Sequence, residues 1–382
     1  MKILVLGAGR MGFGAAFDLA HNSPKVQRVT IADQDISVAE AAADKTASDK
    51  VSPLKVDVSD SNAVSKVFAD HDAAISCVNY WFNEELSKLA ILNRSHLCDL
   101  GGNNGVVDRQ LALDAQAREA GISIIPDCGL APGMVSVLAV HGASRFDILS
   151  EIHIRVGGLP QHPEPPLDYQ LVFSVEGLIN EYVEKARVIR KGEILEIESM
   201  TELEHLEFEG YPPLEAFQTS GGTSTLPDSF GGKVTELDYK TIRYRGHCDK
   251  FKTMIDLGLC SSDPLETQGA EVAPRRILAR LLELHLPADG PDLVFVRLEF
   301  EGQIAGARKT LVYDIVDKQD NETGLSAMMR TTSFPASIIA QMMVEGEVAL
   351  RGATPQEAVI GPESFVEELS RRGIAIDEYF RD

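Results

Sequence analysis

Short apolar segments alternate with longer amphipathic stretches through the first third of the chain. Six segments have the length and apolar content of strands: Met1–Leu6, Arg28–Ala32, Leu54–Val58, Ala73–Val78, His96–Leu100 and Ile122–Pro126. Five stretches between them repeat apolar residues near the helical period: Arg10–Ala20, Ser37–Ala47, Ser61–Ala69, Phe82–Asn93 and Val106–Ala120. Strands that alternate with helices need crossover connections, so we predict an α/β domain around a doubly wound, mainly parallel sheet.

After about residue 148, apolar and polar residues alternate within single segments, which is typical of strands with one solvated face. The segments are Glu151–Val156, Tyr239–Tyr244, Leu293–Phe300 and Lys309–Ile315. They predict a second, antiparallel sheet with a few helices. Residues 335–348 have a strong helical pattern, and we expect this helix to pack on the first domain. We therefore predict a first domain over residues 1–145 and about 330–382, with residues 146–329 as an inserted α+β domain.

Composition and charge narrow the possible partners. With 44% apolar and 25% charged residues, the chain resembles a folded globular protein. A net charge of −22 argues against nucleic acid and anionic membrane surfaces. The first apolar run is too short for a signal peptide and no later run is long enough to span a membrane, so we expect a cytoplasmic protein. Five cysteines without a CxxC pair indicate reduced, mostly buried thiols and no metal site.

A glycine-rich turn follows the first predicted strand and opens the first predicted helix, with glycines at Gly7, Gly9 and Gly12. Glycines in this context allow a tight turn and close backbone approach, and the NH groups of the helix can face a pyrophosphate. The turn predicts a dinucleotide site to which Arg10 and Met11 also contribute. The alternative is a tight turn that binds nothing.

Asp33 stands 21 residues after Gly12, at the end of the second predicted strand, where its carboxylate can accept both ribose hydroxyls. Asp33 and Asp35 would also face a 2′-phosphate. One like-charge contact near 4 Å costs about 4 kcal/mol at an effective dielectric of about 20. We therefore predict NAD as the cofactor, although Arg10 could in principle bind a 2′-phosphate.

Other cofactor contacts are expected where the remaining parallel strands end, because ligands bind at that edge of such a sheet. The residues expected to border the adenine or run beneath the cofactor are Asp57, Val58, Cys77, Val78, Asn79 and Gly101. Asp57 could instead cap the helix that starts near Ser61.

Two polar, glycine-rich segments, 99–104 and 126–134, follow the fifth and sixth predicted strands on the nicotinamide side. They contain three candidate catalytic residues and one candidate substrate contact: Asp99, Asp127, Cys128 and Asn103. Structural alternatives stay open. Asp99 could be a buried carboxylate satisfied by glycine NH groups, Asp127 a helix cap, and Cys128 a small core residue.

Together with the glycine turn and Asp33, three segments resemble the saccharopine reductase-like family, most closely its NAD-dependent lysine 6-dehydrogenase branch. The segments are Asp99-Leu-Gly-Gly, Asp127-Cys-Gly-Leu-Ala-Pro-Gly and Thr241-Ile-Arg-Tyr-Arg-Gly-His247. The resemblance implies a Rossmann domain interrupted by a sheet domain, and a homodimer or homotetramer formed largely through that sheet. It also implies oxidation of the ε-amine of L-lysine to the semialdehyde, which cyclises to piperideine-6-carboxylate. Arg245 stands where proline is expected, which predicts that the substrate side chain contacted there differs from the usual one.

An amino-acid substrate brings a carboxylate and therefore needs a fixed cation. Arg243, at the end of a predicted strand, can bind it with two parallel NH groups, and Arg245 or Lys252 would be weaker substitutes. Tyr244 and the loop that starts at Thr219 are further candidate contacts for the polar end of the substrate, although that loop could equally be a flexible surface segment.

Hydride leaves only from a carbon that carries a neutral amine, so the site needs a base or a lowered amine pKa. His247 is the first candidate, with Asp127 and Asp99 as rivals that could instead hold the ammonium. A structural histidine is the alternative for His247. Two other functions remain open: reductive condensation of an amine with a keto acid or semialdehyde, as in saccharopine or carboxynorspermidine formation, and NAD sensing without turnover. No second arginine cluster for a substrate with more carboxylates is evident in the sequence.

Overall fold

The computed structural model describes residues 1–267, 269–348 and 350–381. The chain divides into two compact units, each built from separate segments. Unit 1 contains Met1–Arg145, Ser224–Ser229 and Met329–Ala375, and unit 2 contains Phe146–Thr223, Phe230–Met328 and Ile376–Asp382. Two segments lie outside the ranges expected for their units, since residues 224–229 belong to unit 1 and the C-terminal strand belongs to unit 2.

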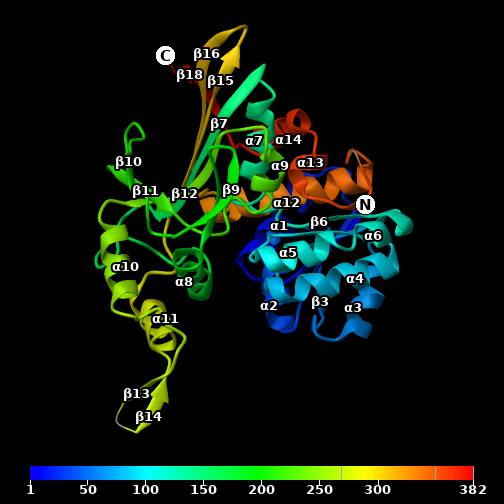
Figure 1. Ribbon diagram of the computed structural model, residues 1–382. Helices are drawn as coiled ribbons and strands as arrows, with labels where there is room; N and C mark the ends of the chain where they lie inside the picture. Colours follow the sequence, from blue (N-terminus) through cyan, green and yellow to red (C-terminus); the bar gives the residue numbers. More distant parts are fainter. Residues whose placement is uncertain (268, 349, 382) are drawn as a thin grey trace. The chain divides into compact units, whose positions relative to one another are not determined.

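Unit 1 is built on a seven-stranded parallel sheet with the order β17-β6-β5-β4-β1-β2-β3. Figure 1 labels β3 and β6 of this sheet. The strands are β1 (Lys2–Leu6), β2 (Arg28–Asp33), β3 (Val51–Lys55), β4 (Ala73–Ser76), β5 (His96–Asp99), β6 (Ser123–Ile125) and β17 (Gly352–Ala353). The predicted doubly wound fold is confirmed. β3 begins three residues earlier than predicted and contains Pro53, which an edge strand tolerates because one side of its backbone is unpaired.

The helices of unit 1 are α1 (Arg10–His21), α2 (Ile36–Thr46), α3 (Ser61–Phe68), η1 (Tyr80–Phe82), α4 (Asn83–Asn93), α5 (Asn104–Leu111), α6 (Asp114–Ala120), α7 (Met134–Ala143), α9 (Leu226–Phe230), α12 (Ala327–Glu345), α13 (Gln356–Val359) and α14 (Pro362–Arg371). The predicted helix over 106–120 is two helices, α5 and α6. α12 begins eight residues before its predicted start at Pro335. It packs on α1, where the Ser333 hydroxyl donates to the carbonyl of Met11 at 2.8 Å.

Unit 2 contains a nine-stranded sheet whose main path runs β10-β11-β12-β7-β15-β16-β18, with β8 and β9 beside β12. The strands are β7 (Ile148–Pro160), β8 (Ala186–Arg190), β9 (Glu193–Ile197), β10 (Glu204–Leu206), β11 (Leu214–Gln218), β12 (Glu236–Tyr244), β15 (Asp292–Ile304), β16 (Ala307–Lys318) and β18 (Asp377–Arg381). The sheet is mixed, which corrects the antiparallel prediction, because β12 pairs with β7 in parallel.

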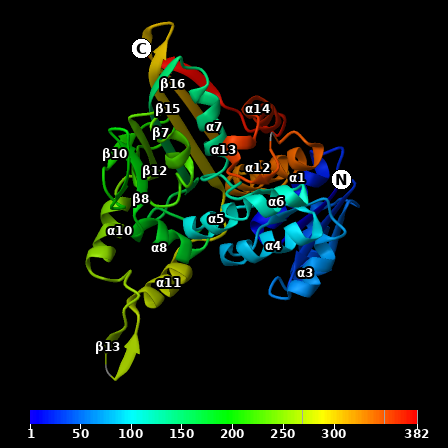
Figure 2. The same cartoon turned by 45° about the vertical axis from the view of Figure 1, so that its right-hand side comes forward.

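Three helices, α8 (Val175–Val183), α10 (His247–Asp256) and α11 (Pro274–His285), complete unit 2 together with a small hairpin of β13 (Leu265–Thr267) and β14 (Ala270–Val272). Figures 1 and 2 both show this hairpin projecting beyond α11. The apolar core of the unit includes Tyr169, Tyr182, Phe217 and Phe251. Across the described residues of both units, no helix combines the length and apolarity needed to cross a bilayer.

Candidate functional site

The glycine turn of unit 1 connects β1 to α1, and two of its glycines are required by geometry. Gly7 has φ +93°, and a Cβ built on it would lie 2.8 Å from the carbonyl oxygen of Cys77. A Cβ on Gly12 would lie 1.8 Å from the carbonyl oxygen of Gly7. A Cβ on Gly9 would meet nothing within 4 Å, so this side of the turn is open. The turn therefore fits a ligand that approaches the backbone closely, as a dinucleotide pyrophosphate does.

Asp33 ends β2 beside this turn and holds it in place. Its carboxylate accepts hydrogen bonds from the backbone N of Ala8 at 2.9 Å and of Asp35 at 3.0 Å. A carboxylate has about four acceptor positions, so capacity remains for ribose hydroxyls. Asp35 caps α2 by accepting from the backbone N of Ser37 at 2.9 Å, and the bonds from Ser37 lower the pKa of Asp35.

The other predicted cofactor residues follow the strand ends of the same sheet. Asp57 accepts from the Ser59 backbone N at 2.9 Å and from the Ser59 hydroxyl at 2.7 Å. The alternative that Asp57 caps α3 is wrong, because Asp60 is the capping residue. Val78 approaches Gly7, since its Cγ1 would lie 3.1 Å from a Cβ built there. Arg10 and Met11 are the first residues of α1. The remaining predicted contacts follow β3, β4 or β5: Val58, Cys77, Asn79 and Gly101.

Asp99 and Asp127 lie together where β5 and β6 end. Asp99 is fully buried and accepts from the backbone N of Gly101 at 2.8 Å and from the side-chain amide of Gln110 at 2.8 Å. The backbone N of Asp127 also donates to Asp99, at 3.3 Å. Asp99 thus has the hydrogen bonds of a structural carboxylate, the alternative that the sequence left open. Burial raises its pKa.

Asp127 is held differently and is the stronger candidate for proton transfer. It has φ +61°, it is buried, and the Ser224 hydroxyl donates to its carboxylate. Burial, with the nearby charge of Asp99, raises the pKa of Asp127 to about 8. The helix-cap alternative is wrong, because Gly133 is the residue before α7. A carboxyl group with such a pKa can both bind and release a proton near neutral pH.

Two other predicted residues in this region have local structural partners. The Cys128 thiol is fully buried, its pKa is raised by burial, and its Sγ lies 3.2 Å from the carbonyl oxygen of Ile125. Asn103 caps α5 by accepting from the backbone N of Val106 at 3.2 Å. These contacts favour packing for Cys128 and helix capping for Asn103.

In unit 2, Arg243 lies on β12, 2% exposed, in an aromatic environment. Its guanidinium carbon lies 4.8 Å from the ring centroid of Tyr169 and 5.7 Å from that of Tyr182. Nε donates to the Tyr182 hydroxyl at 2.8 Å, and Nη1 donates to the carbonyl of Ile242 at 2.9 Å. Within the described ranges, no carboxylate forms an ion pair with Arg243. A buried cation that forms no ion pair is suited to bind an anionic ligand.

His247 starts α10, whose first turn is held by the Glu215 carboxylate through the backbone N atoms of Gly246 and Cys248. The ring is fully buried, and Nδ1 lies 2.9 Å from the carbonyl oxygen of Leu167. A carbonyl only accepts, so Nδ1 carries the proton, and Nε2 accepts from the Tyr182 hydroxyl at 3.1 Å. Burial and the charge of Arg243 lower the pKa of His247 to about 3. The geometry favours a structural histidine that orients Tyr182.

The remaining predicted substrate contacts have different environments. The Tyr244 hydroxyl donates to the carbonyl of Pro160 at 2.8 Å. Thr219 is buried, and its hydroxyl lies 2.6 Å from that of Thr241. Arg245 is exposed.

Sequence reasoning missed three neighbours of Arg243: Tyr169, Glu181 and Tyr182. They come from the long loop after β7 and from α8, segments whose patterns gave no sign of chemistry. Glu181 lies beside Tyr182 on α8. Burial raises the pKa of the Glu181 carboxyl to about 7, although the positive charge of Arg243 acts to lower it. No local motif points to these residues, because their proximity to β12 arises only in the folded unit.

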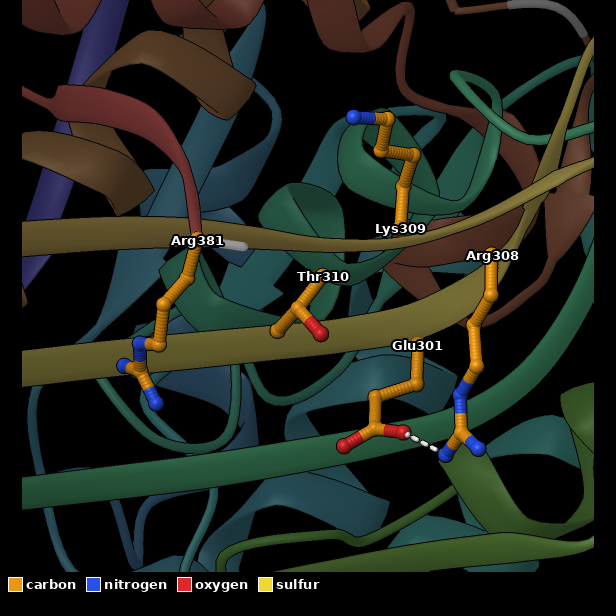
Figure 3. Close-up of a pocket in the computed structure, with 5 residues that line it drawn as sticks. All are labelled: Glu301, Arg308, Lys309, Thr310 and Arg381. Atoms are coloured by element: carbon orange, nitrogen blue, oxygen red, sulfur yellow. Dashed lines mark hydrogen bonds and ion pairs between the residues drawn. The ribbon is translucent and has the colours of Figure 1, made fainter.

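A hollow on unit 2, whose lining residues are drawn in Figure 3, contains none of the predicted site residues. Glu301 of β15, Arg308, Lys309 and Thr310 of β16, and Arg381 of β18 line it. Glu301 and Arg308 point toward one another and form an ion pair at 2.6 Å, whereas Lys309 points away from them. Glu301 pairs with Glu151 across β15 and β7, and Glu151 pairs with Glu236 at the start of β12. The hollow therefore lies toward the opposite end of the strands from Arg243.

Comparison with known proteins gives a consistent match over nearly the whole chain. A family model described as the saccharopine dehydrogenase NADP binding domain matches residues 3–125, and one described as the saccharopine dehydrogenase C-terminal domain matches residues 129–374. The chain is 26% identical over 409 residues to carboxynorspermidine synthase of Vibrio cholerae, with 99% of this chain and 96% of that protein covered. It is 25% identical over 301 residues to the NADP-dependent, L-glutamate-forming saccharopine dehydrogenase of Saccharomyces cerevisiae. That match covers 74% of this chain and 63% of the yeast enzyme.

Two solved structures share the fold. Apo L-glutamate-forming saccharopine dehydrogenase from Saccharomyces cerevisiae superimposes with a TM-score of 0.81 at 20% identity, covering all of both chains. Homospermidine synthase from Legionella pneumophila, in complex with NAD, gives a TM-score of 0.61 at 12% identity and covers 100% of this chain and 91% of that chain.

Proposed function

The chain belongs to the saccharopine dehydrogenase family, whose members are oxidoreductases that act on CH–NH bonds, and we propose that it oxidises the ε-amine of L-lysine or a close amino acid with NAD. The product is the semialdehyde, which cyclises to piperideine-6-carboxylate. The observation that carries the proposal is Arg243, a buried cation with no ion pair in the described chain. One such cation suits a substrate with one carboxylate.

NAD is proposed as the cofactor because the Asp33 carboxylate lies at the end of β2, beside the open side of the glycine turn. The family model carries the name of an NADP binding domain, and the yeast relative is NADP-dependent, so cofactor preference needs its own test. We expect wild-type protein to bind NAD more tightly than NADP in a fluorescence titration. Asp33→Ala should weaken NAD binding. Equal affinity of wild type for both cofactors would contradict this part of the proposal.

In the proposed reaction, bound NAD supplies the acceptor for the hydride that leaves the amine-bearing carbon, and water hydrolyses the resulting imine to the semialdehyde and ammonium. Gly7, Gly9, Gly12 and Asp33 would hold the cofactor. Arg243 binds the substrate carboxylate. Asp127 accepts the proton that the substrate ammonium must lose, because its raised pKa lets the carboxylate compete for a proton near pH 8. The Ser224 hydroxyl donates to this carboxylate and orients it.

A second candidate function is reductive condensation of an amine with a keto acid or semialdehyde. The match over 96% of carboxynorspermidine synthase favours it. NADH absorbance at alkaline pH, followed with a panel of amino acids and polyamines, distinguishes lysine oxidation from reductive condensation. We expect NADH to form with NAD and L-lysine alone. Consumption of NADH only when an amine and a semialdehyde are both present would replace lysine oxidation with condensation. Binding of NAD with neither reaction would support the sensing alternative.

The oligomeric state of the protein is a proposal that rests on the family resemblance. We expect a homodimer or homotetramer formed largely through the sheet of unit 2, because wide sheets with exposed edges tend to be covered. Light scattering at micromolar concentration tests this, and a monomeric mass would contradict it.

A further inference from the structure

Three polar groups around the Arg243 guanidinium have no hydrogen-bond partner among the described residues. Arg243 Nη2 makes no hydrogen bond, since the guanidinium uses Nε and Nη1 for its protein contacts. The Tyr169 hydroxyl is buried without a partner, although its ring lies against the guanidinium. The Glu181 carboxylate also accepts no hydrogen bond. Buried polar groups in folded proteins are nearly always satisfied, so the buried, unpartnered Tyr169 hydroxyl beside Arg243 suggests that a ligand supplies its partner.

The cluster holds one positive and one negative side chain that do not neutralise each other by contact. Arg243 and Glu181 each affect the pKa of the other, so they are close enough to interact through their charges. No ion pair joins them. The other titratable side chains that interact with Glu181 are tyrosines, namely Tyr169, Tyr182 and Tyr239.

The surrounding contacts keep this arrangement in place. His247 and Arg243 both bond the Tyr182 hydroxyl, which fixes the side of the guanidinium that faces α8. The backbone carbonyl of Glu181 accepts from the backbone N of Ser220 at 2.9 Å, which ties α8 to the loop after β11. Gly222 of that loop lies against the ring of Tyr239, where a Cβ would come within 2.4 Å of Cδ1.

We propose that Arg243, Glu181 and Tyr169 form a recognition site for the α-amino-carboxylate head group of an amino acid. Arg243 binds the carboxylate, Glu181 accepts from the α-ammonium, and the Tyr169 hydroxyl donates to a carboxylate oxygen. An α-amino acid presents one anion and one cation on neighbouring atoms, which matches the adjacent charges of this cluster. The inference rests on the proposed function for its substrate class. Because the head group is bound intact, oxidation is directed to the far end of the side chain.

Calorimetry on protein saturated with NADH tests the site by binding, without turnover. The probes are L-lysine, 6-aminohexanoate, which lacks the α-amine, and 1,5-diaminopentane, which lacks the carboxylate. Wild type should bind L-lysine at least tenfold more tightly than either analogue. Glu181→Gln should weaken L-lysine binding tenfold or more and leave 6-aminohexanoate unchanged. Arg243→Lys should weaken both carboxylate ligands and leave 1,5-diaminopentane unchanged.

Glu184→Gln is the matched control, because Glu184 is exposed at the end of the same helix. This variant should leave all three affinities unchanged. Tyr169→Phe removes only the unpartnered hydroxyl and gives a second test if Glu181→Gln does not fold; it should weaken both carboxylate ligands. Equal wild-type affinity for L-lysine and 6-aminohexanoate would overturn the site, as would an equal loss for all ligands in Glu181→Gln.

The outcomes also separate this inference from the proposed function. Binding of L-lysine that depends on Glu181, without any oxidation, keeps the recognition site and overturns lysine oxidation. Oxidation of L-lysine with an unchanged KM in Glu181→Gln keeps the function and overturns the site. If L-lysine does not bind, a panel of L-ornithine, L-glutamate and L-2-aminoadipate is titrated, and absence of binding by all of them overturns the inference.

Discussion

The sheet of unit 2 contains two buried arginines on neighbouring parallel strands, and their surroundings differ in one decisive respect. Arg155 on β7 is 6% exposed and forms ion pairs with Glu204 and, at 2.7 Å, with Asp238. Arg243 on β12 is 2% exposed and is surrounded by tyrosines, with no ion pair in the described chain. Leaving a buried charge uncompensated costs folding free energy, so we interpret Arg155 as a structural cation and Arg243 as a ligand-binding one.

The same contrast separates the acids and the histidines. His153 and Arg155 bond Asp238, and these contacts outweigh the effect of burial and lower the pKa of Asp238. Asp127 in unit 1 has no cationic partner among the influences on its pKa, which rises to about 8. Burial lowers the pKa of both histidine rings, but the contacts with Asp238 reverse the effect for His153. Charged partners stabilise the charge of Asp238 and His153, whereas Asp127 has no cationic partner and remains available to exchange a proton with a substrate.

Removing the arginine that forms ion pairs should have a large effect on stability. Arg155→Ala leaves Asp238 and Glu204 without this cation and should lower the free energy of unfolding by about 3–5 kcal/mol, as expected when one partner of a buried ion pair is removed. Urea denaturation followed by circular dichroism measures it. At a temperature where the variant is folded, its KM for L-lysine should match wild type. A raised KM with unchanged stability would reverse the assignment of the two arginines.

Asp127→Asn tests whether Asp127 is the proton acceptor. Loss of the proton acceptor should lower kcat about 10²-fold, because positioned general bases contribute at least that much. Wild-type kcat should rise as pH passes through about 8, where Asp127 becomes the carboxylate, and the variant should lack this step. Ser224→Ala removes a hydrogen bond that favours the carboxylate, so it should shift the step to higher pH. A normal pH profile in Asp127→Asn would show that the base is elsewhere.

The smallest expected effect concerns the pH dependence of stability. His247 has a lowered pKa in the folded state, so its contribution to stability is complete above pH 6.5 and is lost as pH falls toward 3. His153 has a raised pKa, so its contribution is complete below pH 6.5 and is lost as pH rises above that value. Urea midpoints from pH 4 to 8 should therefore change in opposite directions with pH for His247→Asn and His153→Asn, each relative to wild type. Parallel curves would contradict the difference in environment.

Local patterns predicted unit 1 well, because alternation of strands and helices and the spacing of Gly7, Gly9 and Gly12 are properties of neighbouring residues. The same is true of Asp99 and Asp127, which meet because parallel strands end at one edge of a sheet. The cluster around Arg243 could not be predicted from the sequence. Tyr182 lies 61 positions from Arg243, and their contact depends on how the helix and loops after β7 fold. The parallel pairing of β7 and β12 was missed for the same reason, since a long connection separates the strands.

The steady-state kinetics of Arg243→Lys test whether Arg243 binds the substrate carboxylate. Lysine keeps the charge but loses the forked pair of donors, and the second bond of a bidentate contact contributes about 1.5 kcal/mol or more. With saturating NAD, we predict that KM for L-lysine rises tenfold or more while kcat changes by less than about threefold, because the contact is made equally in the ground state and the transition state. An unchanged KM would show that another group holds the carboxylate and would contradict this role of Arg243.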